Sequence, residues 1–295
     1  MNLGEQAFLA LQRLLPRRGL SSLVGWLTRL EAGALTHFAI RAFVAAYKVD
    51  MRDAAEPDIS TYPSFNRFFT RALAPDARPL PEDPQAFVSP ADGTLSEIGE
   101  FTPERMLRAK GLDYGLTELL GGDADLAARF AGGSFATVYL APYNYHRVHL
   151  PWRATPRSLR FVPGELYSVN ATTVRLVPGL FCRNERMILA CEDDAGRWFA
   201  LVLVGALNVG SIELTVPAGA TNRPQPTVGA HRSLPLDGPP LARGAEIGRF
   251  NMGSTVVVLA SPGWLEWRDL AVSATVRMGE TLARALPGAP AATGR

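Results

Sequence analysis

Gly253 and Ser254 are the two residues of this chain that could most directly do covalent chemistry. A residue without a Cβ precedes a hydroxyl side chain in the segment GRFNMGSTVVVL, and a β-branched run from Thr255 to Val258 follows. Such a run predicts a rigid, buried strand. Taken alone, the segment favours a bulge at Gly253 and a small polar turn residue at Ser254. A catalytic Ser254 would need a base, and that base would need an orienting group.

Two histidines in the segment APYNYHRVHLPW are the candidate bases. His146 and His149 are three residues apart, so an extended strand would turn them to opposite sides, whereas a bend would bring them together. A lone histidine on a strand is more often a hydrogen-bonded packing residue. A neutral imidazole near pH 7 is also the natural acceptor for the proton of a serine hydroxyl, so either histidine could serve.

Asp92, in the segment SPADGTL, is the candidate orienting carboxylate. An Asp-Gly pair is commonly no more than a tight turn, which is the alternative for Asp92 and Gly93. Two further segments could belong to the same site, namely NERMIL at 184–189 and VGALNVGSIEL at 204–214. Tight packing within a sheet is the alternative for both of them.

Composition restricts the class of protein. With 295 residues and 47% apolar content, the chain can bury the core of one large domain and carry a helical appendage. A net charge of +2 is too small to indicate a nucleic-acid partner. Cys182 and Cys191 lack metal-ligand spacing, so we expect no metal site and a reducing compartment. Lys48 and Lys110 are the only lysines, and enzymes that use pyridoxal phosphate need a lysine anchor.

The N-terminal residues predict amphipathic helices. Apolar stripes at helical spacing run through 8–15, 20–30 and 35–46, and basic residues outnumber acidic ones around them. This composition is typical of helices that lie on an anionic membrane surface, although the stripes could equally pack on the domain behind them. No segment is long and apolar enough to span a bilayer, and MNLGEQ lacks the basic start of a secretory signal. The aromatic cluster of FNRFFTR, interleaved with Arg67 and Arg71, favours a short core helix.

The rest of the chain predicts short strands separated by Gly, Pro and Asp turns. The clearest strands are 135–140, 186–191, 198–204 and 255–259. Asp193 to Gly196 predicts a hairpin turn, and 103–120 predicts partly helical structure. We therefore expect an α+β fold, with a sheet-rich sandwich or barrel-like core and N-terminal amphipathic helices.

In their order along the chain, these segments resemble the phosphatidylserine decarboxylase family, pyruvoyl-dependent enzymes that make phosphatidylethanolamine. The resemblance covers most of residues 62–260. It rests on eight segments, which are FNRFFTR, SPADG, RAKGLDYGLTELLGG, YHRVHLP, PGELYSVN, FCRNERMI, VGALNVGSIE and GRFNMGSTVVVL. Two residues depart from the family pattern: Met252 stands where leucine is usual, and Ala154 stands where glycine is common.

The resemblance implies a proenzyme that cleaves itself between Gly253 and Ser254. The products would be a β chain of residues 1–253 and an α chain of residues 254–295, and Ser254 would become the pyruvoyl group, a covalent cofactor in place of pyridoxal phosphate or a metal. His149 matches the base of the family and Asp92 its partner. His146 matches a second histidine that acts on the substrate. Residues 1–60 would be a membrane-associating helical region, and 61–295 the decarboxylase domain.

The implied chemistry is self-consistent. His149 takes the proton of Ser254, whose oxygen attacks the Gly253 carbonyl and turns an amide into an ester. β-Elimination then splits the chain and leaves a dehydroalanine at residue 254, which tautomerises and is hydrolysed to a ketone with loss of ammonia. This ketone can accept the electrons released as CO₂ departs. No lysine is needed.

The resemblance also implies partners and a location. We expect phosphatidylserine in a membrane as substrate, an anionic membrane surface as partner, and a peripheral position on the cytoplasmic side of the cell membrane. A second copy of the chain, in a homodimer, is a further candidate partner. Two alternatives stay open. One is a pyruvoyl enzyme acting on a soluble amino acid, and the other is a membrane-surface binding module that never cleaves.

Overall fold

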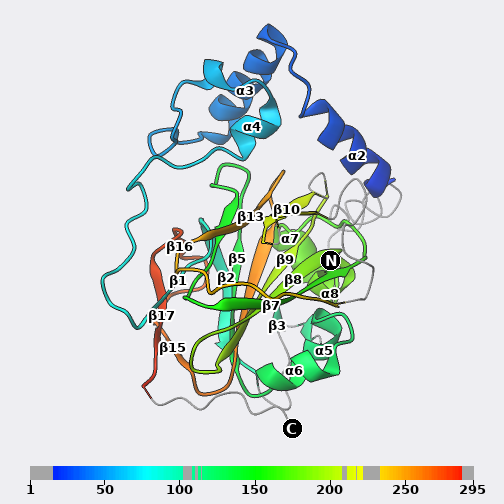
Figure 1. Cartoon of the computed structure of the whole chain (residues 1–295). Coiled ribbons are helices and arrows are strands. Elements are labelled where there is room, and N and C mark those ends of the chain that lie inside the picture. Colours follow the sequence, from blue (N-terminus) through cyan, green and yellow to red (C-terminus); the bar gives the residue numbers. More distant parts are fainter. Residues whose placement is uncertain are drawn as a thin grey trace.

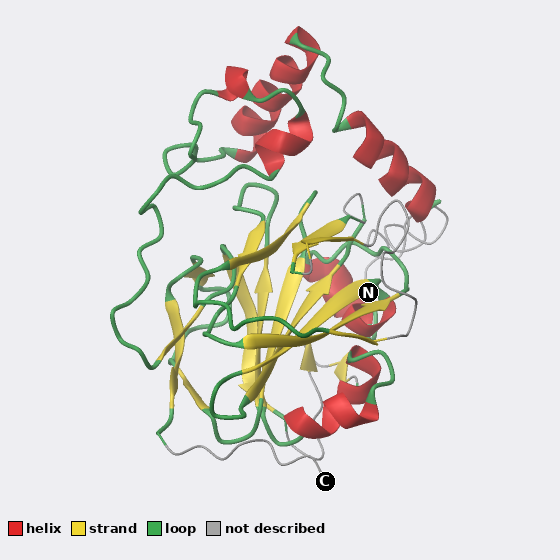
Figure 2. Ribbon diagram, viewed as in Figure 1, coloured by secondary structure: helices red, strands yellow, loops and turns green. Residues whose placement is uncertain are grey.

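The computed structural model describes most of the chain. The described residues are 16–101, 108–109, 112–113, 115–207, 211–216, 218–221 and 233–287. Helices gather at the N-terminal end, and strands dominate the rest of the chain (Figures 1 and 2). The predicted α+β fold with a sheet-rich core is therefore confirmed. The helical stripe expected at 8–15 lies outside the described residues.

The helices of the N-terminal region follow the predicted stripes. They are α2 (Arg17–Leu27), α3 (Ala34–Tyr47), the 3-10 helix η1 (Ile59–Thr61) and α4 (Phe65–Phe69). The Ser64 hydroxyl accepts a hydrogen bond from the backbone N–H of Arg67 and so caps the start of α4. Phe68 and Phe69 are buried in one cluster with Ile40 of α3, which confirms that FNRFFTR forms a short core helix. Within the described ranges, no helix has the length and apolarity to cross a bilayer.

An eight-stranded antiparallel sheet forms the centre of the molecule. Its strand order is β12-β7-β8-β9-β14-β5-β2-β16. The strands are β2 (Gly93–Glu100), β5 (Ser134–Tyr139), β7 (Thr155–Val162), β8 (Arg186–Glu192), β9 (Trp198–Val204), β12 (Ser233–Pro235), β14 (Thr255–Ala260) and β16 (Thr275–Val276). All four predicted strands are present, with ends within one residue of the prediction. The predicted turn joins β8 to β9, with Gly196 at a φ of 75°.

Smaller sheets and four short helices cover the central sheet. One sheet has the order β11-β10-β13-β6 and another β1-β17-β15, and β3 pairs with β4. Their strands are β1 (Ala86–Val88), β3 (Arg108–Ala109), β4 (Leu112–Asp113), β6 (Arg147–His149), β10 (Ile212–Thr215), β11 (Ala218–Thr221), β13 (Glu246–Phe250), β15 (Leu265–Trp267) and β17 (Thr281–Ala285). The helices are α5 (Leu116–Leu119), α6 (Ala124–Phe130), α7 (Ala171–Leu176) and α8 (Leu180–Arg183). Within 103–120, the described part is helical only in α5.

The strand that begins just after Ser254 is buried on both faces. Val256 and Val258 of β14 belong to a core shared with the smaller sheets, whereas Val257 and Leu259 belong to a core shared with α5, α6 and α8. A strand covered on both sides is apolar at every position rather than at alternate ones. The central place of β14 therefore fixes the position of Ser254 at its start.

Candidate active site

Gly253 and Ser254 lie in the short connection between β13 and β14. The backbone carbonyl of Ser254 accepts a hydrogen bond of 2.8 Å from the N–H of Leu140, which extends the pairing of β14 with β5. The Phe250 N–H donates to the carbonyl of His146 at 2.9 Å. The linker between β5 and β6 is thus bound to both sides of the Gly253–Ser254 bond.

Two buried polar side chains without partners meet at this peptide bond. The Ser254 hydroxyl is fully buried and makes no hydrogen bond to the described residues. A Cβ placed on Gly253 would lie 3.1 Å from Nε2 of His146. His146 is also fully buried, and neither of its ring nitrogens has a partner in the described part of the chain. Buried polar groups are rarely left unpaired, so this pair marks a place built for something other than stability.

Burial also sets the protonation state of His146. Its ring packs on Phe69, with centroids 4.0 Å apart. Loss of hydration lowers the pKa of His146 to about 3, and the positive charge of Arg71 acts in the same direction. His146 is therefore neutral at pH 7 and can accept a proton only from a group held directly against it.

His149 is held in the tautomer that a general base needs. Its Nδ1 lies 2.8 Å from the carbonyl oxygen of Gly244, and its Nε2 lies 2.8 Å from the Tyr145 hydroxyl. Because a carbonyl can only accept, Nδ1 carries the proton, and Nε2 accepts from Tyr145. Burial lowers the pKa of His149, while the negative charge of Asp92 acts weakly in the opposite direction. The ring is therefore neutral near pH 7, with its lone pair on Nε2.

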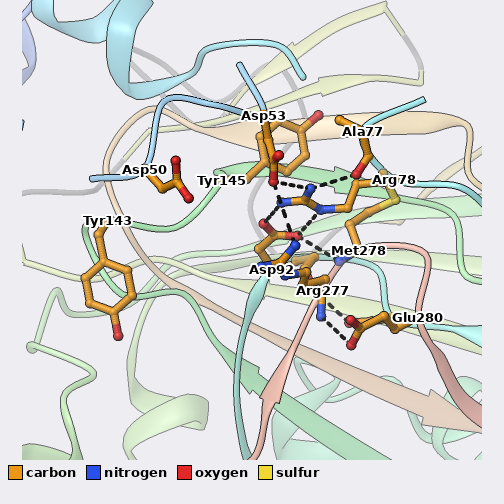
Figure 3. Close-up of polar contacts among 12 residues, drawn as sticks. Asp50, Asp53, Ala77, Arg78, Asp92, Tyr143, Tyr145, Arg277, Met278 and Glu280 are labelled. Atoms are coloured by element: carbon orange, nitrogen blue, oxygen red, sulfur yellow. Dashed lines mark hydrogen bonds and ion pairs between the residues drawn. The ribbon is translucent and has the colours of Figure 1, made fainter. Parts of the chain in front are cut away.

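Asp92 is bound by an arginine. Nε of Arg78 lies 3.2 Å from Oδ1 of Asp92 and Nη2 lies 2.7 Å from Oδ2, and the Met278 N–H donates to Oδ1 at 2.8 Å (Figure 3). Nη1 of Arg78 binds Asp53 at 2.6 Å. Gly93, which follows Asp92, allows a close approach, because a Cβ there would lie 2.4 Å from the carbonyl oxygen of Tyr139.

Of the predicted site residues, only some are in direct contact in the described part of the chain. His146 lies directly against Gly253, whereas Asp92, His149 and Ser254 are not joined by hydrogen bonds to one another in the described part of the chain. The His149 N–H donates to the Pro90 carbonyl at 2.8 Å, so the SPADG segment and β6 are backbone neighbours.

Two residues of the site were missed by sequence reasoning. Tyr145 precedes His149 by four residues inside YHRVH, and a hydroxyl so near a histidine was a usable signal. Arg78 lies in a proline-rich stretch and carried no signal of its own.

A cavity of about 220 Å³ opens beside Gly253. Most of its walls are apolar or aromatic, and they include Phe43, Tyr47, Phe69, Tyr139 and Met252. Phe43 and Tyr47 come from α3, so the N-terminal helices contribute directly to the surroundings of the Gly253–Ser254 bond.

Comparisons with known proteins give the class and the family. Residues 65–284 match the family model described as phosphatidylserine decarboxylase, and residues 7–48 match one described as PSD. The chain is 48% identical, over 284 residues and 96% of each chain, to the phosphatidylserine decarboxylase proenzyme of Bordetella avium (strain 197N). It is 46% identical over 286 residues to the protein of that name from Pseudomonas aeruginosa (strain UCBPP-PA14), covering 96% of this chain and 98% of the relative.

These matches make the chain an enzyme of the decarboxylase class. It belongs to the phosphatidylserine decarboxylase family, as the motif order predicts.

Proposed function

We propose that the chain is a proenzyme that cleaves itself between Gly253 and Ser254 and then decarboxylates phosphatidylserine to phosphatidylethanolamine. The observation that carries the proposal is the buried, unpaired Ser254 hydroxyl, at a glycine that lies against the unpaired ring of His146. The names of the relatives, which are both proenzymes, support both the substrate and the processing.

The residues around position 254 fit a pyruvoyl group. The cavity beside Gly253 offers space, and the absence of a Cβ at Gly253 keeps that space open toward His146. Leu140, whose N–H binds the Ser254 carbonyl, would hold the group in place. Once formed, the group would supply an electron sink for the pair of electrons left when CO₂ departs.

Self-cleavage begins with a proton transfer. His149 is neutral and has its lone pair on Nε2, so it is equipped to take the proton of Ser254 once the Tyr145 hydroxyl leaves that nitrogen. The serine oxygen then attacks the carbonyl carbon of Gly253, and the imidazolium returns the proton to the departing amide nitrogen. An ester replaces the amide.

Asp92 and His146 have separate roles in this proposal. The carboxylate of Asp92 stabilises the imidazolium of His149 through its charge, and Arg78 fixes its position. His146, which is neutral and lies beside Gly253, is placed to exchange a proton with the substrate in the later decarboxylation.

Residues 1–60 would associate with the membrane, and 61–295 would form the decarboxylase domain. Large apolar side chains of the N-terminal helices are exposed, including Trp26 at 60%, Leu35 at 68% and Phe38 at 64%. A helix with such a face can lie in the lipid interface. The chain would therefore sit peripherally on the anionic cytoplasmic face of the cell membrane.

The arginines of α2 hold this helix against the sheet domain. Arg17 pairs with Glu165 at 2.7 Å and stacks over the ring of Tyr167, and Arg18 donates to the carbonyl of Gly164. Since α3 also lines the cavity at Gly253, a lipid at the membrane surface would lie next to the cleavage site.

Denaturing electrophoresis together with an activity assay tests the proposal. Purified protein should run as two chains and release CO₂ from phosphatidylserine but not from free serine. Ser254→Ala should stay whole and inactive, and His149→Ala and Asp92→Asn should mature poorly. Normal maturation of the last two variants would remove both residues from the cleavage step, and release from free serine would favour a soluble substrate.

A further inference from the structure

Arg71 is a buried cation that leaves most of its hydrogen-bonding capacity unused. Only 6% of the residue is exposed. To the described residues, its guanidinium makes one hydrogen bond, from Nη2 to the carbonyl of Tyr143 at 3.2 Å, and it lies 5.4 Å from the ring centre of Phe68. No carboxylate pairs with it among the described residues. Burial lowers the pKa of Arg71, whereas the charges of Asp92 and Asp50 act in the opposite direction without direct contact, and an arginine keeps its charge.

Two other arginines with largely buried side chains have every guanidinium nitrogen engaged in hydrogen bonds. Arg78 binds the carboxylates of Asp53 and Asp92. Arg186 donates to four backbone carbonyls, which are those of Glu118, Leu119, Cys182 and Asn184. Structural roles thus account for Arg78 and Arg186. They do not account for Arg71.

Arg71 lines a pocket of about 500 Å³ together with Arg67 and Arg147. Arg67 is exposed, and its side chain makes no ion pair or hydrogen bond with the described residues. Arg147 already uses two of its nitrogens: Nη1 donates to the Glu246 carboxylate at 2.8 Å, and Nε donates to the carbonyl of Thr70 at 3.0 Å. Glu56 is the one acidic side chain among the described residues that line it. The pocket therefore presents an excess of positive charge to a ligand.

This pocket adjoins the cleavage site through consecutive residues. The ring of Phe69 packs on His146, and Thr70 and Arg71, which come next, line the pocket. Arg147 directly follows His146. Arg71 is also near enough for its charge to act on His146. An anion held in this pocket would therefore lie next to residues that are consecutive with Phe69 and His146, which surround Gly253.

We propose that Arg71, assisted by Arg67 and Arg147, binds the phosphodiester of a lipid headgroup. Guanidinium groups match phosphate oxygens in charge and geometry. A phosphodiester keeps its charge throughout the decarboxylation, so an arginine can hold substrate and product alike. An arginine on the carboxylate would instead stabilise the group that must leave. The identity of the lipid rests on the proposed function.

Equilibrium binding measured by calorimetry tests this proposal. The probes are dihexanoyl phosphatidylethanolamine below its micelle concentration, glycerophosphoethanolamine and inorganic phosphate, none of which carries the carboxylate that the enzyme would remove. We expect Arg71→Gln to lower the affinity for both phosphodiesters about ten- to a hundredfold, which is the range for the loss of a hydrogen bond to a charged group. Arg268 is exposed and lies outside the pocket, so Arg268→Gln should bind the phosphodiesters as tightly as the parent does.

Two results would overturn the proposal. Unchanged affinity for the phosphodiesters in both Arg71→Gln and Arg67→Gln is one of them. The other is that inorganic phosphate binds the parent as tightly as the phosphodiesters do and no longer binds Arg71→Gln. That result would make the pocket a free-phosphate site. Arg67 is exposed, so Arg67→Gln should fold even if Arg71→Gln does not, and we expect it to weaken binding about threefold or more.

Scoring cleavage on the same samples separates this proposal from the proposed function. A chain that binds phosphodiesters through Arg71 but never cleaves would refute the function alone. A cleaved, active chain whose Arg71→Gln and Arg67→Gln variants bind phosphodiesters normally would refute the headgroup site alone.

Discussion

His146 and Gly253 are in such close contact that a Cβ on Gly253 would lie 3.1 Å from Nε2 of the histidine and 3.2 Å from the carbonyl oxygen of Leu140. Gly253 is not among the glycines with positive φ. Space, rather than backbone conformation, therefore explains why glycine precedes Ser254.

Gly253→Ala should slow self-cleavage. The added methyl group would push His146 or the backbone aside by a few tenths of an ångström, and small misplacements of reacting groups cost about ten- to a hundredfold in rate. Pulse labelling in cell-free synthesis, followed by electrophoresis, would give the rate. Gly238→Ala is the matched control, because a Cβ there meets no atom within 4 Å. Equal rates for both variants would show that the contact does not matter.

Tyr145→Phe should move the acid limit of self-cleavage to higher pH. In the proposed mechanism, cleavage needs neutral His149. Because burial lowers the pKa of His149, the parent rate should decline only below the ordinary pKa of histidine, about 6.5. The Tyr145 hydroxyl stabilises the neutral ring by donating to Nε2. Loss of this hydrogen bond, worth about 1 kcal/mol, should raise the pKa of His149.

A pH series of cleavage rates on newly synthesised chain would measure this shift. An acid limit that stays in place, or moves to lower pH, would show that Tyr145 does not act on His149 in this way.

Arg78→Met should destabilise the fold strongly. Removing the arginine leaves the buried Asp92 carboxylate without its partner, and breaking a buried pair from one side costs about 3–5 kcal/mol. Urea unfolding in a Ser254→Ala background, where we expect one intact chain, would measure the loss. Arg157→Met is the control, since its pair with Glu192 is more exposed and should be worth below about 1 kcal/mol. Similar losses in both would contradict a structural role for the Arg78–Asp92 pair.

The strands could be predicted more fully than the site. β14 is apolar at each position from Val256 to Ala260. A continuous apolar run of this kind is expected in a strand that is buried on both faces. The contact of His146 with Gly253 depends on the path of the linker between β5 and β6, which has no periodicity to read. Arg78 likewise reaches Asp92 from an irregular stretch, so only the fold reveals the pair.

The charges of the N-terminal helices show the same limit. Their basic residues indicate a membrane surface, yet Arg17 and Arg18 bind the sheet domain in the folded chain. The sequence pattern gives the charge of a helix, but it does not show which neighbouring group the charged side chains contact. Arg29, Arg41 and Lys48 are exposed in or next to these helices, as are apolar side chains such as Trp26 and Phe38.

Trp26→Ser combined with Phe38→Ser should weaken binding to anionic liposomes. Each substitution removes a large exposed apolar side chain, worth about 1.5–3 kcal/mol when buried in lipid, so partitioning should fall at least about tenfold. Sedimentation with vesicles of phosphatidylglycerol and phosphatidylethanolamine would measure it. Val272→Ser, at another exposed apolar position, serves as the control. Partitioning that matches this control would exclude α2 and α3 from the membrane contact.

Intact mass spectrometry of the purified protein tests the central claim most directly. The account predicts two chains with masses that place the break between Gly253 and Ser254, the smaller one blocked at its N-terminus and reactive toward carbonyl reagents. A single chain with the mass of all 295 residues, or a break at another bond, would contradict it.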